Sequence, residues 1–411
     1  MTEIDSPKIQ EIRIAAIGNV DSGKTTTVSV LCNDILDDGR GKARSKVLKH
    51  SHEGTTGRTS SITHCYKRNK QQDGEKIHAF VDLAGHEKYL KTTMTGLNGC
   101  MIDFAMVTIG TNMGVLGTTK EHLGIALALQ IPIFIILTKL DICPKPVLEK
   151  TRSKISKIMS SKAAGRKKVV MVDDSMAMES VIHQFNNREN ICPIFSISNV
   201  KGEGVELLKN FVEKLESKRK WNSNHKNSLF LIDDVFKIPG VGTVVSGSVK
   251  KGTISKDDKL FLGPFNGKFK KVNVRNIHNN FKENVKFLEG GHSGCFNIKS
   301  MSKDTILRNH IKRGMILVKN PKCVISFEAE IMILHHPTTI RVNYQPVVHC
   351  GTVRQSAKIV KMSKELVRTG DKANVVFEFL YHPEYIEANS RITFREGKTK
   401  GIGKIRKVIY K

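Results

Sequence analysis

Eight residues near the start of the chain limit what it can fold into more than any others do. They read Gly18-Asn19-Val20-Asp21-Ser22-Gly23-Lys24-Thr25, with the apolar run 12–17 before them and apolar residues at helical spacing in 24–35 after them. This is the G-x-x-x-x-G-K-[ST] pattern of a loop that wraps phosphate groups. The glycines allow close approach of the backbone, the lysine reaches the β- and γ-phosphates, and the threonine hydroxyl ligates Mg²⁺. We therefore expect a buried strand, a phosphate-binding loop and a helix, in that order.

Two further motifs follow predicted strands. Asp82-Leu83-Ala84-Gly85-His86 comes after the strand expected at 76–82. An acidic group there can hold a Mg²⁺-bound water, and Gly85 can offer its amide to a γ-phosphate. Thr138-Lys139-Leu140-Asp141 comes after the apolar strand expected at 131–137. The Asp141 carboxylate can accept from N1–H and the 2-amino group of guanine, a donor pair that adenine lacks. The Lys139 stem can lie along the purine; a helix-capping role for Asp141 is the alternative.

Strands and helices alternate through the first half of the chain. Further strands are expected at 62–67, 104–109 and 192–196, and further helices at 121–129, within 141–168 and at 205–215. This alternation predicts a doubly wound α/β domain with loops at the strand C-termini. Two stretches lack a steady period: 37–61 is expected to be a mobile loop, and 171–190 an irregular insertion.

The pattern changes after a charged hinge that contains the only tryptophan. From residue 229 onward, short alternating segments punctuated by Gly, Asp and Asn predict all-β barrels. The expected domains are 9–218, a linker at 219–228, and barrels at 229–320 and 324–411. The glycines in 239–242 are expected to form a turn, since no helix follows them. The adjacent pair His335-His336 would point to opposite faces of a strand, which argues against one shared metal.

The composition indicates which class of partner and which cell compartment to expect. The 411 residues carry 67 Lys+Arg against 39 Asp+Glu, a net charge of +28, which favours a polyanionic partner such as RNA or the ribosome. Lysine used only for solubility is the alternative. Eight cysteines without a C-x-x-C pair indicate reduced, mostly buried thiols. The absence of a long apolar run, and early acids without an apolar h-region, argue against a membrane span, a secretory signal or a transit peptide. We expect a cytoplasmic protein.

The motifs, taken together, resemble those of a known family. GNVDSGKT, a switch threonine, DLAGH, TKLD and SNVKG stand in the order of the five guanine-nucleotide motifs. The histidine after D-x-x-G and the aspartate in G-N-V-D resemble translational GTPases of the elongation factor Tu / 1-alpha class. A set of longer strings is similar to the GTP-binding protein 1 and 2 family, over roughly residues 10–411: DDGRGKARSK, GRTSS, DLAGHEKYLKTTMTG, TKEHLGIALAL, IPGVGTVVSG, LHHPTTI, HCGTVRQSA and FREGKTK.

The resemblance implies a fold and a set of roles. The fold is an α/β P-loop GTPase domain, with a doubly wound and mostly parallel sheet, followed by two all-β barrel domains. His86 would be the catalytic residue that orients the attacking water. Asp21 would bind a water of the Mg²⁺ site or a monovalent cation near the phosphates. Mg²⁺ would be held by Thr25 and by Thr59 of the switch, or by Ser61 as the rival, with Asp82 acting through water. The expected nucleotide contacts are Gly18, Asn19, Val20, Asp21, Ser22, Gly23, Lys24, Thr25, Thr26, Asp82, Leu83, Ala84, Gly85, His86, Thr138, Lys139, Leu140, Asp141, Ser198 (to the guanine O6, through its backbone), Asn199 and Val200.

Three departures from the family pattern are visible. Thr138 replaces the commoner Asn of the base motif, so we expect a modest nucleotide affinity. Many elongation factors carry an Ile that screens the catalytic histidine as part of a hydrophobic gate, and Arg58 stands at that position here. Val20 could still form one side of the gate. Members of the family also carry a long N-terminal extension, and we expect its contribution to be missing here.

The leading hypothesis is a monomeric GTPase switch that acts in translation. It would bind GTP and GDP, hydrolyse GTP slowly alone and faster on the ribosome, and hold the acceptor arm of an aminoacyl-tRNA or another RNA with its barrels. A GTP-controlled RNA-surveillance or ribosome-rescue factor that recruits decay machinery is the alternative. A sulfate adenylyltransferase subunit, an ATP-using P-loop enzyme of the same architecture, is a third possibility.

Overall fold

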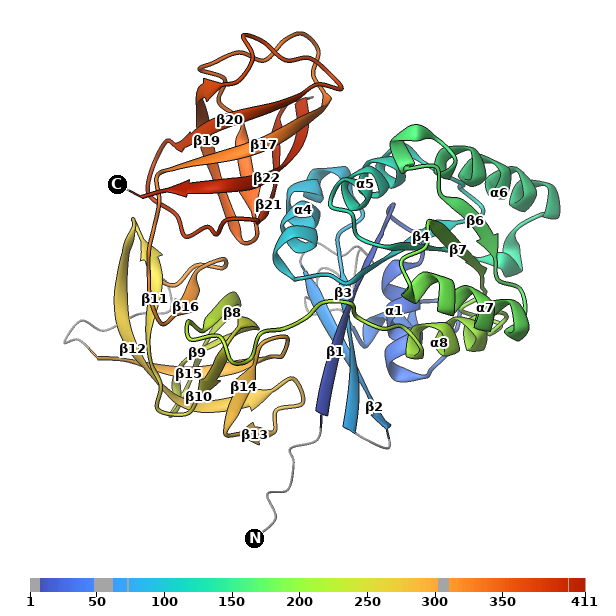
Figure 1. Cartoon of the computed structure of the whole chain (residues 1–411). Coiled ribbons are helices and arrows are strands. Elements are labelled where there is room, and N and C mark those ends of the chain that lie inside the picture. The colour runs from blue at the N-terminus through green and yellow to red at the C-terminus, as the bar shows by residue number, and fades with distance from the viewer. Residues whose placement is uncertain (1–7, 48–61, 72–73, 302–309, 398, 411) are drawn as a thin grey trace. The chain divides into compact units, whose positions relative to one another are not determined.

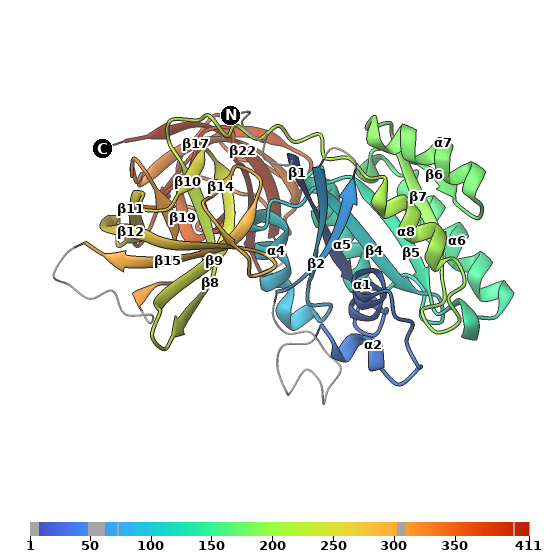
Figure 2. The same ribbon diagram turned by 90° about the horizontal axis from the view of Figure 1, so that it is seen from below.

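The chain forms two compact units, which Figures 1 and 2 show in two views. One contains most residues up to 219, and the other contains residues from 220 onward. The computed structural model describes residues 8–47, 62–71, 74–301, 310–397 and 399–410. Arg58, Thr59 and Ser61, to which the sequence assigns switch roles, lie outside the described residues.

The first unit is built on one seven-stranded sheet. Its strands are parallel except β2, which pairs antiparallel with β3 at one edge. Central strands such as β4 and β5 are buried along their whole length, because helices cover both faces of a parallel sheet. In sheet order the strands are β2 (Thr63–Gln71), β3 (Gly74–Asp82), β1 (Lys8–Gly18), β4 (Phe104–Gly110), β5 (Ile133–Thr138), β7 (Ile191–Ser196) and β6 (Lys168–Met171).

Helices pack on both sides of this sheet (Figure 1). One face is covered by α1, α7 and α8, whose apolar residues join a core centred on Phe104, Phe134, Phe185 and Phe211, with ring centroids 5.4–6.3 Å apart. The α-helices are α1 (Lys24–Asn33), α2 (Lys42–Ser45), α4 (Leu90–Gly99), α5 (Gly117–Ala128), α6 (Lys145–Met159), α7 (Ser175–Asn186) and α8 (Val205–Glu213); 3-10 turns lie at Glu87–Tyr89, Leu140–Ile142 and Lys162–Ala164. The doubly wound α/β prediction is confirmed.

The expectation of an irregular insertion at 171–190 is wrong. Residues 168–171 form the edge strand β6, and most of the remainder is α7. The Asp174 side chain caps this helix by accepting from the amide of Ala177 at 2.7 Å. The buried residues of α7 are spaced as one helical face that packs against the sheet: Met178, Val181, Ile182 and Phe185. These apolar residues have helical spacing in the sequence, but the polar residues between them make the pattern hard to recognise.

The second unit begins with a barrel closed by the pairing of β11 with β12. The expected turn at 239–242 is the connection of the β8–β9 hairpin, where Gly240 and Gly242 have φ values of +76° and +103°. In order around this sheet the strands are β11 (Lys259–Phe265), β16 (Ile316–Val318), β8 (Leu229–Ile238), β9 (Gly242–Lys251), β15 (Ser293–Ser300), β12 (Lys268–Asn279) and β13 (Asn284–Val285); β10 (Thr253–Ser255) pairs with β14 (Phe287–Glu289).

A second closed barrel completes this unit. Alternate residues of β17 are buried, which is the period-two pattern of a strand with one face on a core. The core includes Phe327, Phe377, Phe379 and Phe394. Around the barrel the strands are β17 (Ser326–His335), β20 (Lys372–Phe379), β19 (Val353–Met362), β18 (Val347–Cys350), β21 (Arg391–Glu396) and β22 (Thr399–Ile409). The prediction of two all-β barrels is confirmed, and the individual domain boundaries stay predictions.

A partly buried charge cluster joins the two barrels within the second unit. Glu387 accepts from Lys250 at 2.8 Å and from Lys251 at 2.5 Å, and Tyr385 donates to the same carboxylate at 3.2 Å. Burial alone would raise the pKa of Glu387, but the two ammonium groups outweigh it and hold the pKa at about 2. Thr352 adds a hydroxyl bond to the carbonyl oxygen of Gly314, at 2.9 Å.

The cysteine side chains are less buried than the sequence suggests. All eight cysteines are free; three are buried and five are partly exposed, so the expectation of mostly buried thiols is wrong. Across the described part of the chain, no helix is both long and apolar enough to span a bilayer.

Candidate nucleotide-binding site

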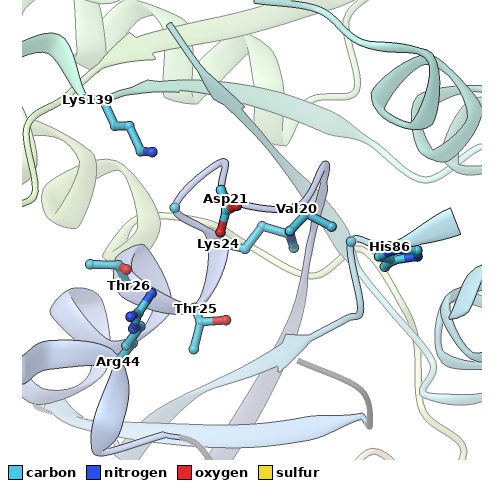
Figure 3. Close-up of a pocket in the computed structure, with 10 residues that line it drawn as sticks. Val20, Asp21, Lys24, Thr25, Thr26, Arg44, His86 and Lys139 are labelled. Carbon is cyan, nitrogen blue, oxygen red and sulfur yellow. The ribbon is translucent and has the colours of Figure 1, made fainter. Parts of the chain in front are cut away.

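The phosphate loop, the loop after β3, helix α2 and the loop after β5 surround one pocket in the first unit (Figure 3). Most of its lining was expected from the sequence, and one member, Arg44, was not. The lining residues are Val20, Asp21, Gly23, Lys24, Thr25, Thr26, Arg44, Gly85, His86 and Lys139.

The backbone of the phosphate loop requires glycine at both ends of the motif. Gly18 has φ +145°, and a Cβ there would lie 2.2 Å from the carbonyl oxygen of Thr108. Gly23 has φ +83° and stands at the N-cap of α1, where no side chain caps the helix. The N-terminus of α1 thus has no side-chain cap from its N-cap residue, and the helix dipole there favours an anion.

Lys24 is held at the centre of the site. Its side chain is buried, and Nζ donates to the carbonyl oxygen of Asn19. Burial lowers the pKa of Lys24 from its ordinary value to about 8, although the charges of Asp82 and Asp21 oppose that shift. A bound polyphosphate would favour the ammonium form, so this lysine is prepared for an anion.

Thr25 and Asp82 form a pair of oxygen groups beside Lys24. The Thr25 hydroxyl donates to Oδ2 of Asp82 at 2.6 Å, and Asp82 is fully buried. Hydroxyl and carboxylate oxygens are the ligand type that Mg²⁺ prefers, so these two residues fit that ion. Gly85 lies against the loop so closely that a Cβ would fall 2.4 Å from Nζ of Lys24. Its backbone thus reaches the same end of the pocket.

Asp141 is fixed by a neighbour from another loop. The Ser198 hydroxyl, fully buried, donates to Oδ1 of Asp141 at 2.7 Å and accepts from the amide of Lys201 at 3.0 Å. Lys139, which lines the pocket, adopts the left-handed conformation with φ +62°. The sequence assigned Ser198 a backbone contact only; its side chain also orients the predicted base-reading carboxylate.

Thr138 ties the base loop to the phosphate loop. Its hydroxyl is buried and donates to the carbonyl oxygen of Ser22 at 2.7 Å. The Thr111 hydroxyl in turn donates to the carbonyl oxygen of Thr138 at 2.7 Å. Threonine is shorter than the asparagine that is commoner at this position, yet its side chain still reaches the phosphate loop. The modest nucleotide affinity expected from this replacement stays a prediction.

Four other residues predicted for the site are Leu83, Ala84, Asn199 and Val200. Leu83 and Ala84 are buried, so only their backbone could face a ligand. Asn199 donates from Nδ2 to the Thr27 hydroxyl at 2.9 Å, which anchors its loop to α1. Val200 is 40% exposed. The role of each in nucleotide contact stays a prediction.

His86 stands where the polypeptide enters a 3-10 turn. Its Nδ1 accepts from the amide of Lys88 at 3.1 Å, so the neutral ring carries its proton on Nε2. The ring makes an edge contact with Tyr89, with centroids 6.1 Å apart. In Figure 3, Val20 lies between Lys24 and His86.

Sequence reasoning missed three supporting groups besides Ser198. His122 of α5 is buried and accepts the amide of Gly18 on Nδ1 at 3.3 Å; burial lowers the pKa of His122 to about 4. Thr118 donates to Oδ1 of Asn19 at 2.6 Å. Arg44 belongs to the stretch expected to be a mobile loop, yet residues 42–45 form α2. Only the family-like strings TKEHLGIALAL and DDGRGKARSK marked these positions.

A phosphate loop after β1, an aspartate at the end of β3 and the predicted base-reading aspartate after β5 define a P-loop nucleotide-binding protein. Models of two families match the chain: the elongation factor Tu GTP-binding domain over residues 10–217, and the elongation factor Tu C-terminal domain over residues 320–409. The chain belongs to the translational GTPases of the elongation factor Tu type, and within them to the GTP-binding protein 1 and 2 family.

Two relatives show the extent of the likeness. GTP-binding protein 1 of Xenopus laevis is 43% identical over 424 residues, which cover 97% of this chain and 64% of that protein. GTP-binding protein 2 of Homo sapiens is 36% identical over 427 residues, which cover 98% of this chain and 70% of that protein. The chain thus spans about two thirds of the length of these relatives.

Solved structures share the fold. Translation elongation factor SelB from Methanococcus maripaludis, in complex with the GTP analogue GPPNHP, matches with a TM-score of 0.72 and 21% identity, over 98% of this chain and 80% of that one. The GTPase-like domain of S. cerevisiae Ski7, bound to GTP, matches with a TM-score of 0.77 and 13% identity, over 97% of each chain.

Proposed function

We propose that this protein is a GTP-driven switch of the translation elongation factor type, which binds GTP and hydrolyses it to GDP and phosphate. The observation that carries the proposal is the joining of a guanine-reading carboxylate and a phosphate loop in one framework. Thr138 bonds the base loop to Ser22 of the phosphate loop, and Ser198 holds Asp141. A ligand that satisfies both ends must carry guanine and phosphates together.

Selection of the base rests on hydrogen-bond donors. Guanine offers N1–H and a 2-amino group to the carboxylate of Asp141, whereas adenine offers no such pair. A ligand that leaves a buried polar group of the site without a hydrogen-bond partner is rejected strongly. The Ser198 bond at 2.7 Å restricts the rotation of that carboxylate, which supports its use as a reader of the base.

The phosphate end supplies charge and hydrogen bonds. Lys24 and the amides of the first turn of α1 neutralise the terminal phosphates, and Thr25 and Asp82 would hold Mg²⁺, with Asp82 acting through water. The ion, when bound, neutralises the charge that develops between the β- and γ-phosphates. Thr59 completes the proposed ligand set, and Ser61 is the alternative.

His86 is the proposed catalytic residue. With Nδ1 engaged by the Lys88 amide, Nε2 is the nitrogen left to orient a water for attack on the γ-phosphorus. The oxygen of that water bonds to the γ-phosphorus while the bond between this phosphorus and the oxygen shared with the β-phosphate breaks, and the proton of the water leaves on the released phosphate. We propose that the reaction is slow for the isolated protein and is stimulated by the ribosome, where His86 is brought into place.

We propose that the partners are the ribosome and aminoacyl-tRNA or another RNA, in the cytoplasm. The net charge of +28 supports a polyanion. Strands of both barrels carry dense positive charge: Lys268, Lys270, Lys271 and Arg275 on β12, and Lys400, Lys404, Arg406 and Lys407 on β22. The proteins that share the fold include elongation factors, which supports a role in translation.

The deciding experiment is GTP turnover with and without ribosomes, and with aminoacyl-tRNA added or omitted. We expect slow turnover alone, a large stimulation by ribosomes, and loss of that stimulation in His86→Ala. His183→Ala, on the surface of α7, is the matched control and should behave as wild type. Equal turnover by wild type and His86→Ala on ribosomes would refute the catalytic role. GTP-dependent RNA binding without preference for charged tRNA would instead favour the RNA-surveillance or rescue factor.

A further inference from the structure

Arg44 is a cation of the nucleotide pocket that no nucleotide motif contains. It belongs to α2 and lines the pocket together with Thr25 and Thr26. In Figure 3 its side chain points toward the end of the pocket where those two threonines lie, and His86 lies at the opposite end. The position is therefore set apart from the catalytic side of the pocket.

The segment that carries Arg44 is anchored to the helix of the phosphate loop. The Ser29 hydroxyl of α1 donates to the carbonyl oxygen of Ala43 at 2.5 Å, and Ala43 is fully buried. The amide of Ala43 donates to Oδ1 of Asp37 at 2.9 Å. Figure 2 shows α2 beside α1. These bonds fix the backbone one residue before Arg44.

Gly41 makes room for the guanidinium. It has φ +98°, and a Cβ there would lie 2.4 Å from Nε of Arg44 and 2.9 Å from Cζ. Any other residue at position 41 would push the side chain of Arg44 away. The sequence Gly41-Lys42-Ala43-Arg44 thus encodes the direction of the guanidinium as well as the turn that carries it.

The guanidinium of Arg44 has no hydrogen bond or ion pair within the described residues, and it shares the pocket with the cations Lys24 and Lys139. Lys24 is already compensated by Asp82 and Asp21. Bringing cations together costs free energy unless an anion joins them. A guanidinium without a partner at the rim of a phosphate loop is arranged for a phosphate group, which its planar fork can bind through two hydrogen bonds.

We propose that Arg44 binds the α- and β-phosphates of the nucleotide, so that it contributes equally to GTP and GDP. This inference rests on the proposed function. Loop amides of this motif cradle the α- and β-phosphates, and the first turn at Thr25 and Thr26 continues that cradle. Gly85 and His86 belong to the γ-phosphate end. The location of Arg44 beside the threonines therefore assigns it to the diphosphate that both nucleotides share.

The test is calorimetric titration of the whole chain with Mg²⁺-GTP and with Mg²⁺-GDP, for wild type, Arg44→Ala, Arg44→Lys and Arg40→Ala. We expect Arg44→Ala to raise both dissociation constants by about ten- to one-hundredfold, as loss of a charge-assisted hydrogen bond does. Arg44→Lys should recover part of the loss. Arg40, exposed in the same loop and absent from the pocket, is the matched control of charge and should bind as wild type. Melting temperatures without nucleotide should agree among all four proteins.

Three results would overturn the assignment. They are wild-type affinity in Arg44→Ala, a loss confined to GTP, which would mean a γ-phosphate contact, and an equal loss in Arg40→Ala, which would mean a general charge effect. If Arg44→Ala melts early, the Arg44→Lys protein decides by the same two titrations. A wild-type chain that binds neither nucleotide would refute the proposed function itself, so the two failures are distinguishable.

Discussion

Replacing Thr138 with valine removes one buried hydroxyl and keeps the shape of the side chain. In the structure this hydroxyl donates to the carbonyl oxygen of Ser22 at 2.7 Å, and both residues are almost fully buried. The variant leaves the carbonyl of Ser22 without that donor. The phosphate loop then loses its direct bond to the strand that delivers the base-reading motif.

The magnitude follows from the cost of a buried acceptor that has lost its partner, about 1–3 kcal/mol. For a unit of this size, each kcal/mol lowers the melting temperature by about 2–4 °C, so we expect a fall of roughly 2–12 °C. Where the bond orders the loop before the ligand arrives, up to the same free energy is lost from binding. The dissociation constant for GDP should therefore rise about five- to one-hundredfold.

Thermal unfolding and GDP titration of Thr138→Val measure the two effects. The matched control is Thr352→Val, which removes a hydroxyl bond of 2.9 Å to the carbonyl oxygen of Gly314 in the barrel unit. It should lower the stability of that unit and leave GDP affinity unchanged. A Thr138→Val protein that melts and binds GDP as wild type does would show that this bond does not order the phosphate loop.

Two predictions concern pH. Nucleotide binding needs the Lys24 ammonium, and its pKa in the free protein is about 8, so GDP affinity should be constant below pH 7 and about tenfold lower at pH 9; an affinity that stays level to pH 9 would contradict this. The pKa of Glu387 is lowered in the folded chain to about 2, so its stabilisation is complete above the ordinary value of 4.5 and is lost as pH falls from there toward 2. Urea unfolding followed by the fluorescence of Trp221 should show a loss of about 1–3 kcal/mol over that range in wild type and a smaller loss in Glu387→Gln, and identical losses would count against the cluster.

Several parts of the site were predictable because they follow from the order of strands in the chain. Asp82 ends the parallel strand β3 and Asp141 follows the parallel strand β5, and the carboxyl ends of such strands meet at one edge of the sheet. The order of the strands alone therefore predicts that the motifs with Asp82 and Asp141 lie at the same edge of the sheet as the phosphate loop. The two barrels were likewise visible as alternating short segments between turns.

Other parts depend on contacts that no local pattern records. The bond from Thr138 to Ser22 joins residues 116 positions apart, and the bond from Ser198 to Asp141 joins residues 57 apart. Arg44 lies in a polar basic run without periodicity, and its direction depends on the backbone conformation of Gly41 and on a hydroxyl from α1. Such positions become visible only when the elements are packed.

The most direct test of the central claim is calorimetric titration of the chain with the Mg²⁺ complexes of GTP, ATP and xanthosine triphosphate, for wild type and Asp141→Asn. We expect heat of binding only with GTP for wild type. For the variant we expect a shift of preference toward xanthosine triphosphate, because the amide can donate to the extra oxygen of that base. Absence of binding heat with GTP, or equal binding of GTP and ATP by wild type, would contradict the central claim.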